Sequence, residues 1–292
     1  MRGEEAMLAL ILETAKKLPQ VDAVAMEGSR MNKRAPKDIF QDYDVVYVVN
    51  DQESLLADRS WLEVFGEVLI RQLPEEMTLF APTLGERFTF LTLFEDGNRI
   101  DLMLCPHSEL AVLTQEDPFL TVLWDPENLI LAPSAEGDKK FWLQPPHQAE
   151  FSDCCIEFWW VSTYVVKGLW RKEALYAADH LYEICQKELL RMLSWQVGNA
   201  SGWDKSLGKN YKYLPDYLDE DTNRLLFEMR DFSSLSAVWQ SLLTTQELFH
   251  KTALELAEKM DIAYDIMTAE KVMGYTAKWY EDQKQIKTEL DE

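Results

Sequence analysis

Two aspartates separated by one residue, Asp42 and Asp44, have the spacing in this chain that most directly suggests chemistry. Asp44 begins an apolar, mostly β-branched run at residues 44–49, which predicts a buried strand. Residues two apart on a strand point to the same side, so both carboxylates would face one spot and repel each other unless a cation joins them. Magnesium suits this role, because it takes oxygen ligands and binds one or two carboxylates together with substrate phosphates.

A third carboxylate, Asp101, strengthens the prediction of a metal site. Residues 87–106 are typical of two strands joined by a tight turn at residues 95–98, and Asp101 lies inside the second strand between apolar neighbours. An unpaired charge buried there would cost on the order of several kcal/mol or force protonation. We therefore expect Asp101 to share a cation with the other two aspartates.

A Gly-Ser turn, Gly28 and Ser29, follows the first predicted strand at residues 21–26. Its small side chains let backbone N–H groups approach an anion closely, which favours a phosphate site. The loop at residues 30–41 then carries the densest basic cluster of the first half, namely Arg30, Lys33, Arg34 and Lys37. These residues are expected near a triphosphate, and a merely solvated loop is the alternative that stays open.

The elements that must position these residues come first in a region of mixed pattern. Helices are predicted at residues 2–18 and at residues 60–73, the second with Ser60 as its N-cap and Pro74 just beyond its end. A further short strand is predicted at residues 121–125. Strands and helices in this order favour helices packed on a mixed sheet.

The second region is predicted to be helical almost throughout, after a proline-rich stretch at residues 133–146. Apolar or small residues recur at three- and four-residue intervals on one stripe, formed by Phe151, Cys155, Phe158, Ser162, Val165 and Leu169. Residues 174–197, 235–260 and 263–286 continue in the same manner. The sequence therefore predicts an α+β fold, with an N-terminal mixed β-sheet domain and flanking helices at residues 1–146 and a C-terminal all-α helical bundle domain at residues 147–292.

Charge restricts the class of partner. The formal net charge of the 292 residues is −22, which argues against binding to nucleic acid, because that affinity comes largely from Lys and Arg neutralising phosphates. A negative field would instead attract a polycationic small molecule and raise its local concentration. The alternative, that acidity only keeps the protein soluble, stays open.

Cysteine usage and hydropathy restrict the compartment. The four cysteines have no C-x-x-C spacing, so reduced thiols are expected rather than disulfides or a zinc site. No stretch approaches about 18 uninterrupted apolar residues, and the N-terminus differs from a secretory signal. We expect a cytoplasmic protein without membrane contact. No motif reports on oligomeric state, for which a monomer is the working expectation.

A Gly-Ser turn, a D-x-D pair and a lone aspartate on a later strand resemble the nucleotidyltransferase superfamily typified by DNA polymerase β. Longer strings narrow the resemblance: EGSR at 27–30, FQDYD at 40–44, LFEDGNRIDL at 93–102, DCCIEFWWVSTYVVKGLWR at 153–171 and LGKNYKYL at 207–214. They are similar to the bacterial aminoglycoside 6-adenylyltransferases, the streptomycin-modifying enzymes. The resemblance runs from about residue 1 to about residue 280.

The resemblance implies magnesium ligands and phosphate-binding residues at the matching positions. Asp42, Asp44 and Asp101 would hold two Mg²⁺ ions, while Gly28 and Ser29 would receive the phosphates of ATP, the co-substrate. One ion would lower the pKa of an acceptor hydroxyl and the other would cover the triphosphate. In-line attack at the α-phosphorus would then release pyrophosphate.

The helical half offers further candidates. Asp153 and Glu157 lie one helical turn apart on a shared face, where they would bind a cationic acceptor, although a hydrated face or a salt bridge is the alternative. Lys167 and Lys209 are candidates, with Arg30, for reaching the nucleotide phosphates, and either lysine would equally suit an exposed surface. The general base stays open among Asp101, Asp153 and Glu157.

The activity implied is magnesium-dependent transfer of AMP from ATP to the 6-hydroxyl of streptomycin, an aminoglycoside. Two other functions stay open: the same chemistry on another aminoglycoside, a lincosamide or a metabolite, and a non-catalytic nucleotide-binding sensor. The complete set of three aspartates argues against the sensor, since a protein that only binds nucleotide has little need of every metal ligand.

Overall fold

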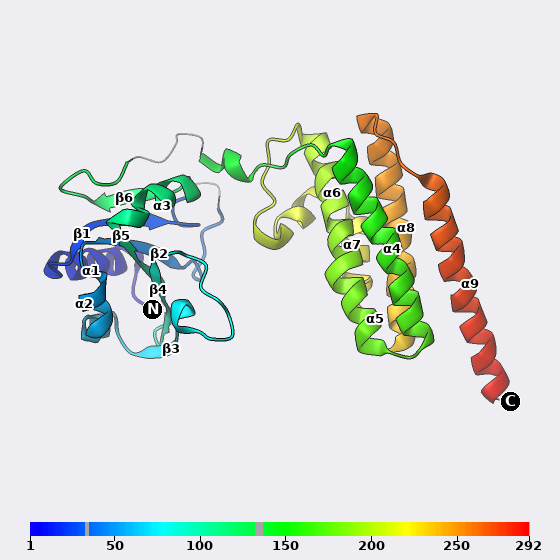
Figure 1. The fold of residues 1–292 in the computed structure, drawn as a ribbon, viewed down its shortest axis with the longest axis horizontal. Helices are drawn as coiled ribbons and strands as arrows, with labels where there is room; N and C mark the ends of the chain where they lie inside the picture. Colours follow the sequence, from blue (N-terminus) through cyan, green and yellow to red (C-terminus); the bar gives the residue numbers. More distant parts are fainter. Residues whose placement is uncertain (33–34, 132–136, 292) are drawn as a thin grey trace. The chain divides into compact units, whose positions relative to one another are not determined.

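The computed structural model describes residues 1–32, 35–131 and 137–291 (Figure 1). The chain forms two compact units, Met1–Lys140 and Phe141–Glu292. The boundary between them lies in the proline-rich stretch, a few residues before the 146/147 division predicted from sequence. Each unit has its own hydrophobic core, so the two are described separately.

The first unit is built on a six-stranded mixed sheet with the strand order β3-β4-β5-β2-β1-β6. Its strands are β1 (Val21–Glu27), β2 (Tyr43–Val49), β3 (Val68–Gln72), β4 (Phe88–Phe94), β5 (Arg99–Pro106) and β6 (Thr121–Trp124). β2 and β5 pair in parallel, and the other neighbours pair antiparallel. The predicted strands at residues 21–26, 44–49 and 121–125 and the predicted hairpin within residues 87–106 are confirmed.

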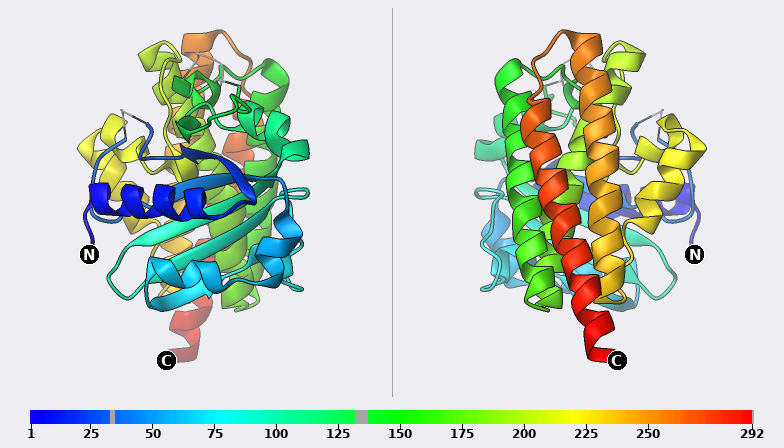
Figure 2. Two further views of the ribbon diagram at one scale, coloured as in Figure 1. Left: turned by 90° about the vertical axis from the view of Figure 1, so that its left-hand side faces the viewer. Right: turned by 90° about the vertical axis from the view of Figure 1, so that its right-hand side faces the viewer.

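Helix α1 (Glu4–Lys17) covers one face of this sheet, and Figure 2 shows it lying across the strands. Met7 and Ile11 of α1 pack in one buried cluster with Val45 and Leu102. The Tyr47 hydroxyl donates a hydrogen bond of 2.6 Å to the carbonyl oxygen of Ile11, which anchors the helix to β2. The helix predicted at residues 2–18 is therefore confirmed.

The opposite face carries the short helix α3 (Leu110–Glu116), which follows the 3₁₀ turn η3 (His107–Glu109). Leu113 of α3 packs with Val46 and Cys105, the strand residues that alternate with those facing α1. The α3 side is the one that matters for chemistry, because Asp44 and Asp101 alternate with the residues on the α1 side. The unit is completed by α2 (Gln52–Ala57) and the 3₁₀ turn η2 (Pro74–Glu76), and the 3₁₀ turn η4 (Gly137–Phe141) spans the boundary to the second unit.

The helix predicted at residues 60–73 is wrong. The structure has a 3₁₀ turn, η1 (Ser60–Phe65), and then the edge strand β3, with Gly66 between them at φ +114°. The Ser60 cap is also wrong, since η1 has no side-chain cap. Pairing of β3 with β4 outweighs the local helical pattern, because the strand ladder satisfies backbone groups that periodicity alone does not consider.

The second unit is helical (Figures 1 and 2). Its helices are α4 (Gln148–Trp170), α5 (Ala174–His180), α6 (Gln186–Ser201), α7 (Glu220–Glu228), α8 (Leu235–Met260) and α9 (Ile266–Asp291), with a π-helical turn (Leu181–Cys185) joining α5 to α6 and the 3₁₀ turns η6 (Lys209–Tyr211) and η7 (Leu214–Tyr217) before α7. The α+β fold class, with a mixed-sheet unit followed by a helical unit, is confirmed.

The core of the helical unit contains the stripe predicted on α4, all of whose members are buried. The rings of Phe158 on α4 and Phe249 on α8 stack with centroids 3.7 Å apart, and the Trp159 ring meets Phe158 edge-on.

Cys105, Cys154, Cys155 and Cys185 are buried free thiols, as predicted. Among the described residues, no helix combines the length and apolar character needed to cross a membrane.

Candidate active site

Carboxylates line up across three adjacent strands on the α3 side of the sheet. Asp44 of β2 is the register partner of Asp101 on β5 and of Glu27 on β1. Register partners in a β-ladder project from the same face, so these three side chains are neighbours. Asp42 lies two residues before Asp44, in the segment that leads into β2. The structure therefore brings the three predicted aspartates to one region and adds Glu27 beside them.

Gly28 lies directly against this row. Its φ of +75° favours glycine, and a Cβ atom at this position would come within 2.8 Å of the Asp44 carboxyl carbon. Only the absence of a side chain lets the backbone turn pass so close to the carboxylate. The Gly-Ser turn and the D-x-D pair, which are separated by a loop in sequence, thus form one local structure.

Burial and mutual repulsion disfavour the ionised forms of these carboxylates. Burial, with the neighbouring Asp101 and Asp42 carboxylates, raises the pKa of Asp44 to about 7. Burial also raises the pKa of Asp42, although Arg99 opposes that shift. The pKa of Glu27 is raised to about 7 by burial and then by Asp117 and Asp44. A cation at this place would relieve the repulsion and favour the ionised carboxylates.

Arg99 is the cation that the structure places against these aspartates. Its Nε and Nη2 atoms donate to the two carboxylate oxygens of Asp101 at 2.8 and 2.7 Å, and Nη1 lies 3.6 Å from Oδ2 of Asp42. Sequence reasoning assigned Arg99 no role. Its position could have indicated the contact, because Arg99 lies two residues before Asp101 on one strand and both side chains are therefore on the same face.

Asp42, Asp44 and Asp101 fit a magnesium site in their chemistry, since all their donor atoms are carboxylate oxygens. Among the described residues, no group of three Asp, Glu, His or Cys side chains stands close enough together to hold one ion. The Asp101 carboxylate instead holds Arg99.

Arg30 holds the basic loop through several contacts. The Arg30 guanidinium donates to the carbonyl oxygens of Gln41 and Asp42, lies 3.8 Å from the centroid of the Tyr43 ring and pairs with Glu4 of α1 at 3.6 Å. These contacts hold the loop and lie toward the α1 side, because Tyr43 belongs to that core cluster. Lys37 is exposed, and Lys33 and Arg34 lie outside the described residues.

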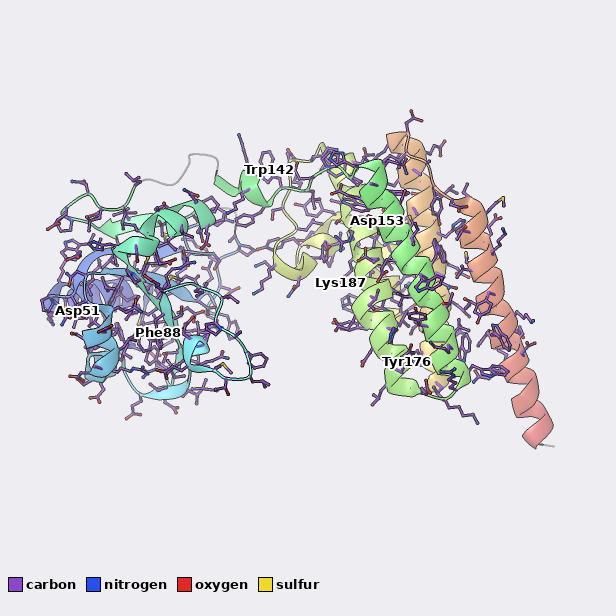
Figure 3. All side chains as sticks on the ribbon, viewed as in Figure 1. Asp51, Phe88, Trp142, Asp153, Tyr176 and Lys187 are labelled. Carbon is purple, nitrogen blue, oxygen red and sulfur yellow. The ribbon has the colours of Figure 1, made fainter. Side chains whose placement is uncertain are left out.

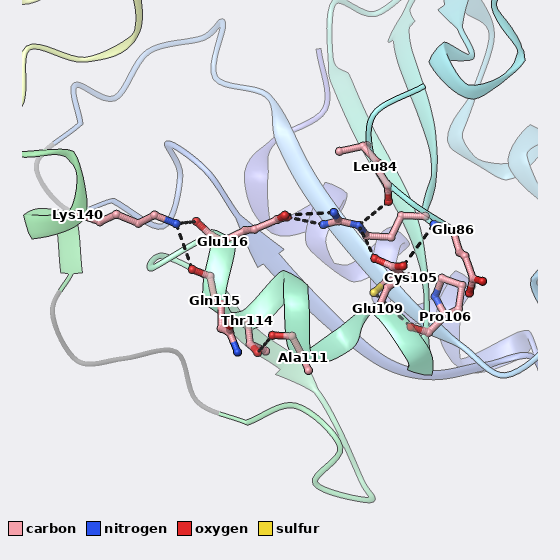
Figure 4. A network of polar contacts seen from close by, with 11 residues as sticks. Leu84, Glu86, Cys105, Pro106, Glu109, Ala111, Thr114, Gln115, Glu116 and Lys140 are labelled. Carbon is pink, nitrogen blue, oxygen red and sulfur yellow. Dashed lines mark hydrogen bonds and ion pairs between the residues drawn. The ribbon is translucent and has the colours of Figure 1, made fainter. Parts of the chain in front are cut away.

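A polar network fixes α3, the helix on the side of the carboxylate row (Figure 4). The buried Arg87 donates to Glu116 at 2.6 Å and lies 3.5 Å from Glu109, while Lys140 donates to the Glu116 carbonyl oxygen at 2.7 Å. Asp117 follows α3 directly and is the residue whose charge most raises the pKa of Glu27. The network thus sets the position of a further carboxylate near the row.

In the helical unit, Asp153 and Glu157 are exposed on the same face of α4; Figure 3 labels Asp153. Trp160, one turn further along, is 61% exposed, and its Nε1 donates to the Tyr164 hydroxyl at 2.8 Å. Lys167 extends this face, with its Nζ 4.5 Å from the centroid of the Tyr164 ring. The face therefore combines carboxylates with an exposed indole.

Lys209 is exposed on η6, away from α4 in sequence. The structure thus places Asp153, Glu157 and Lys167 on one helix, and Lys209 on a separate turn. Trp160 is exposed on the same face of α4 as Asp153 and Glu157. Its exposure distinguishes it from Trp159, which sequence alone does not separate from its neighbour.

A mixed sheet with aspartates in register on adjacent strands, behind a glycine turn that touches one of them, defines the protein as a nucleotidyltransferase. The family model described as Streptomycin adenylyltransferase matches residues 1–279, and the chain belongs to this family. The family and the enzyme class predicted from sequence are confirmed.

Two aminoglycoside 6-adenylyltransferases agree with this assignment. An aminoglycoside 6-adenylyltransferase of Bacillus subtilis is 41% identical over 265 residues, which cover 90% of this chain and 93% of the relative. One from Campylobacter jejuni is 40% identical and covers 94% of this chain and 95% of its own length. A crystal structure of an aminoglycoside 6-adenyltransferase from Bacillus subtilis matches with 37% sequence identity and a TM-score of 0.48, covering 96% of this chain and 99% of that chain.

Proposed function

We propose that this enzyme transfers AMP from ATP to a hydroxyl group of an aminoglycoside in a magnesium-dependent reaction that releases pyrophosphate. Streptomycin is the proposed acceptor because the matching family model is described as Streptomycin adenylyltransferase, and its 6-hydroxyl is the proposed site because the curated relatives are named aminoglycoside 6-adenylyltransferases. The observation that carries the proposal is the register of Asp44 with Asp101 beside Gly28. This arrangement offers oxygen ligands and a backbone turn without a side chain at one place.

In the proposed reaction, Asp42, Asp44 and Asp101 hold magnesium, which supplies charge neutralisation at the triphosphate and activation of the acceptor hydroxyl. Gly28 lets the turn approach the phosphates closely, and the Ser29 hydroxyl and backbone donate to their oxygens. Glu27 adds negative charge next to Asp44, which strengthens attraction of cations to the row. Arg30 keeps the loop between the turn and β2 in place through its carbonyl contacts.

The acceptor is proposed to bind the exposed face of α4 through Asp153 and Glu157. An aminoglycoside carries several cationic groups, and carboxylates pair with them through charge-assisted hydrogen bonds. Trp160 offers an exposed ring on the same face for a cation–π contact. Arg30, Lys167 and Lys209 are the proposed nucleotide-binding cations, and Asp101, Asp153 or Glu157 is the proposed general base.

The test is a pyrophosphate-release assay with ATP, magnesium and a panel of acceptors. Streptomycin is expected to support turnover, while Asp42→Asn and Asp44→Asn are expected to abolish it and keep the fold. Asp51→Asn is the matched control, because Asp51 caps α2 in the same unit and asparagine also caps helices well. Wild-type turnover by the Asp42 or Asp44 variant would overturn the metal-site assignment.

The acceptor panel distinguishes the remaining functions. Turnover with a lincosamide but with no aminoglycoside would mean that the enzyme transfers AMP to another class of acceptor. Binding of ATP without turnover on any acceptor would favour the nucleotide sensor. Both outcomes contradict the proposal.

A further inference from the structure

Arg99 occupies a position that the reaction described above leaves unexplained. Its guanidinium bridges Asp101 and Asp42, with a bidentate contact to Asp101 and a longer one to Asp42. Asp101 is only 16% exposed, whereas Arg99 is 43% exposed. The guanidinium thus enters from the solvent side and covers carboxylates that face it.

The guanidinium and a divalent ion compete for the same place. An ion shared by Asp42 and Asp101 would lie between their oxygens, where the Arg99 nitrogens lie in the structure. Like charges at such distances repel strongly, and the repulsion is only partly screened at a half-buried site. Arg99 has a long, exposed side chain, so it is free to rotate away without disturbing β5.

A displaced guanidinium would have a ready partner in the nucleotide. Arginine binds carboxylate and phosphate groups with the same two-pronged geometry, so the side chain would exchange one anion for another of similar shape. Arg99 would therefore be released toward phosphate at the step in which metal and nucleotide arrive together.

We propose that Arg99 is an exchangeable internal counter-ion of the three-aspartate site, which a divalent ion displaces from Asp101 and which then binds a phosphate group of the nucleotide. The inference rests on the proposed function, since it takes these aspartates as the ligands of the ion. It differs from a fixed positioning role, in which Arg99 would hold Asp101 ready and its loss would weaken ion binding. The two roles predict opposite signs.

Calorimetric titration with Mg²⁺ or Mn²⁺ alone measures the first half of the exchange. Arg99→Gln is expected to bind the ion about tenfold or more tightly than wild type, because the competing charge is gone. Arg99→Lys, which keeps the charge but not the bidentate contact, is expected to lie between them. Arg224→Gln is the matched control: Arg224 pairs with Asp221 and Glu228 on α7, and its removal is expected to change nothing.

The second half is measured with α,β-methylene ATP, whose bridging group blocks transfer of AMP, at saturating Mg²⁺. Arg99→Gln is expected to bind this analogue about tenfold more weakly than wild type, because a charge-assisted phosphate contact is lost. Equal or weaker ion binding by Arg99→Gln would overturn the exchange, and unchanged binding of the analogue would overturn its phosphate step. If neither wild type nor Arg99→Gln binds a divalent ion, with or without the analogue, the proposed function fails as well, which separates that failure from a failure of Arg99 alone.

Discussion

Asp44, a proposed metal ligand, lies where the surrounding carboxylates disfavour its ionised form. It is flanked in register by Glu27 and Asp101 and touched by the backbone at Gly28, so its charge has close acidic neighbours on both sides. Such an arrangement is costly for a carboxylate that must remain ionised. A bound cation would remove this cost, because it would stabilise the ionised carboxylates. The unfavourable electrostatics at Asp44 and the proposed metal site therefore have the same origin.

The raised pKa of Asp44 predicts that the free energy of unfolding depends on pH. Since the folded pKa of Asp44 is about 7 and its ordinary value is 3.8, the folded state holds a proton that the unfolded state releases, and the free energy of unfolding falls as pH rises from about 4 to about 7. Asp44→Asn removes this loss. In urea unfolding with EDTA present, the variant should gain on the order of 2 kcal/mol relative to wild type between about pH 5.5 and pH 8. Parallel profiles would mean that the Asp44 charge is already compensated.

Those residues of the candidate site that form short-range sequence patterns could be predicted from the sequence. Asp42, Asp44 and Gly28 are found from spacing, and Asp101 from its place in a hairpin. Glu27 and Arg99 were missed because their significance comes from the register of β1, β2 and β5, which a single sequence does not reveal. Strand alternation would have put Glu27 on the Asp44 side only if the pairing of the two strands had been known.

Among the elements, the edge strand β3 and its preceding turn depart most from local expectation. Val68, Leu69 and Ile70 are all exposed, although they are the apolar residues that made residues 60–73 resemble a helix. The long helices were predicted because their apolar residues recur at helical spacing, and β1 and β2 because each is a short, nearly continuous apolar run that is buried. β3 has no such buried run, and its pairing with β4 decides its structure.

Gly66 is the residue that makes this turn possible, and its replacement tests the account. Its backbone, at φ +114° and ψ −175°, lies in a region that is nearly restricted to glycine, so Gly66→Ala should destabilise the protein by about 1–3 kcal/mol. The nearest atom to an added Cβ is a side-chain nitrogen of Arg2 at 3.5 Å, an ordinary contact, so strain rather than collision is tested. The measurement is thermal unfolding by calorimetry.

Gly274→Ala provides the control of opposite sign. Gly274 lies inside α9 with open space around its Cα, so alanine should stabilise that helix by about 0.5–1 kcal/mol. If both substitutions have equal effects, the conformation at Gly66 is not the reason that the predicted helix fails.

At the scale of the whole molecule, the net charge of −22 should act differently on the two substrates. Long-range attraction of a polycation and repulsion of ATP are both screened by salt, as the Debye length falls from about 30 Å at 0.01 M to about 8 Å at 0.15 M. We expect kcat/KM for streptomycin to fall several-fold over this range, and kcat/KM for ATP to stay level or rise. Steady-state kinetics at fixed magnesium would measure both. A level profile for streptomycin would leave solubility as the role of the acidity.

The two units are also expected to divide the substrates between them, with phosphate chemistry in Met1–Lys140 and acceptor binding on α4 of the second unit. Glu157 tests this division, because it is exposed, lies on the α4 face beside Trp160 and has no part in the carboxylate row. Glu157→Gln keeps the shape of the side chain and removes the charge that would face a cationic acceptor. The loss of such a contact is worth on the order of 1.5–3 kcal/mol, or roughly ten- to a hundred-fold in kcat/KM for streptomycin.

The matched control for this prediction is Glu258→Gln, since Glu258 is an exposed glutamate on α8 of the same unit. It removes an equal charge from the molecule, so it carries the same change in the long-range field without touching α4. Acceptor kinetics should therefore change for Glu157→Gln and not for Glu258→Gln, while the KM for ATP stays constant in both. An effect of Glu157→Gln on ATP alone, or equal effects of the two variants on streptomycin, would mean that α4 does not bind the acceptor and that the field of the whole molecule is what the acceptor senses.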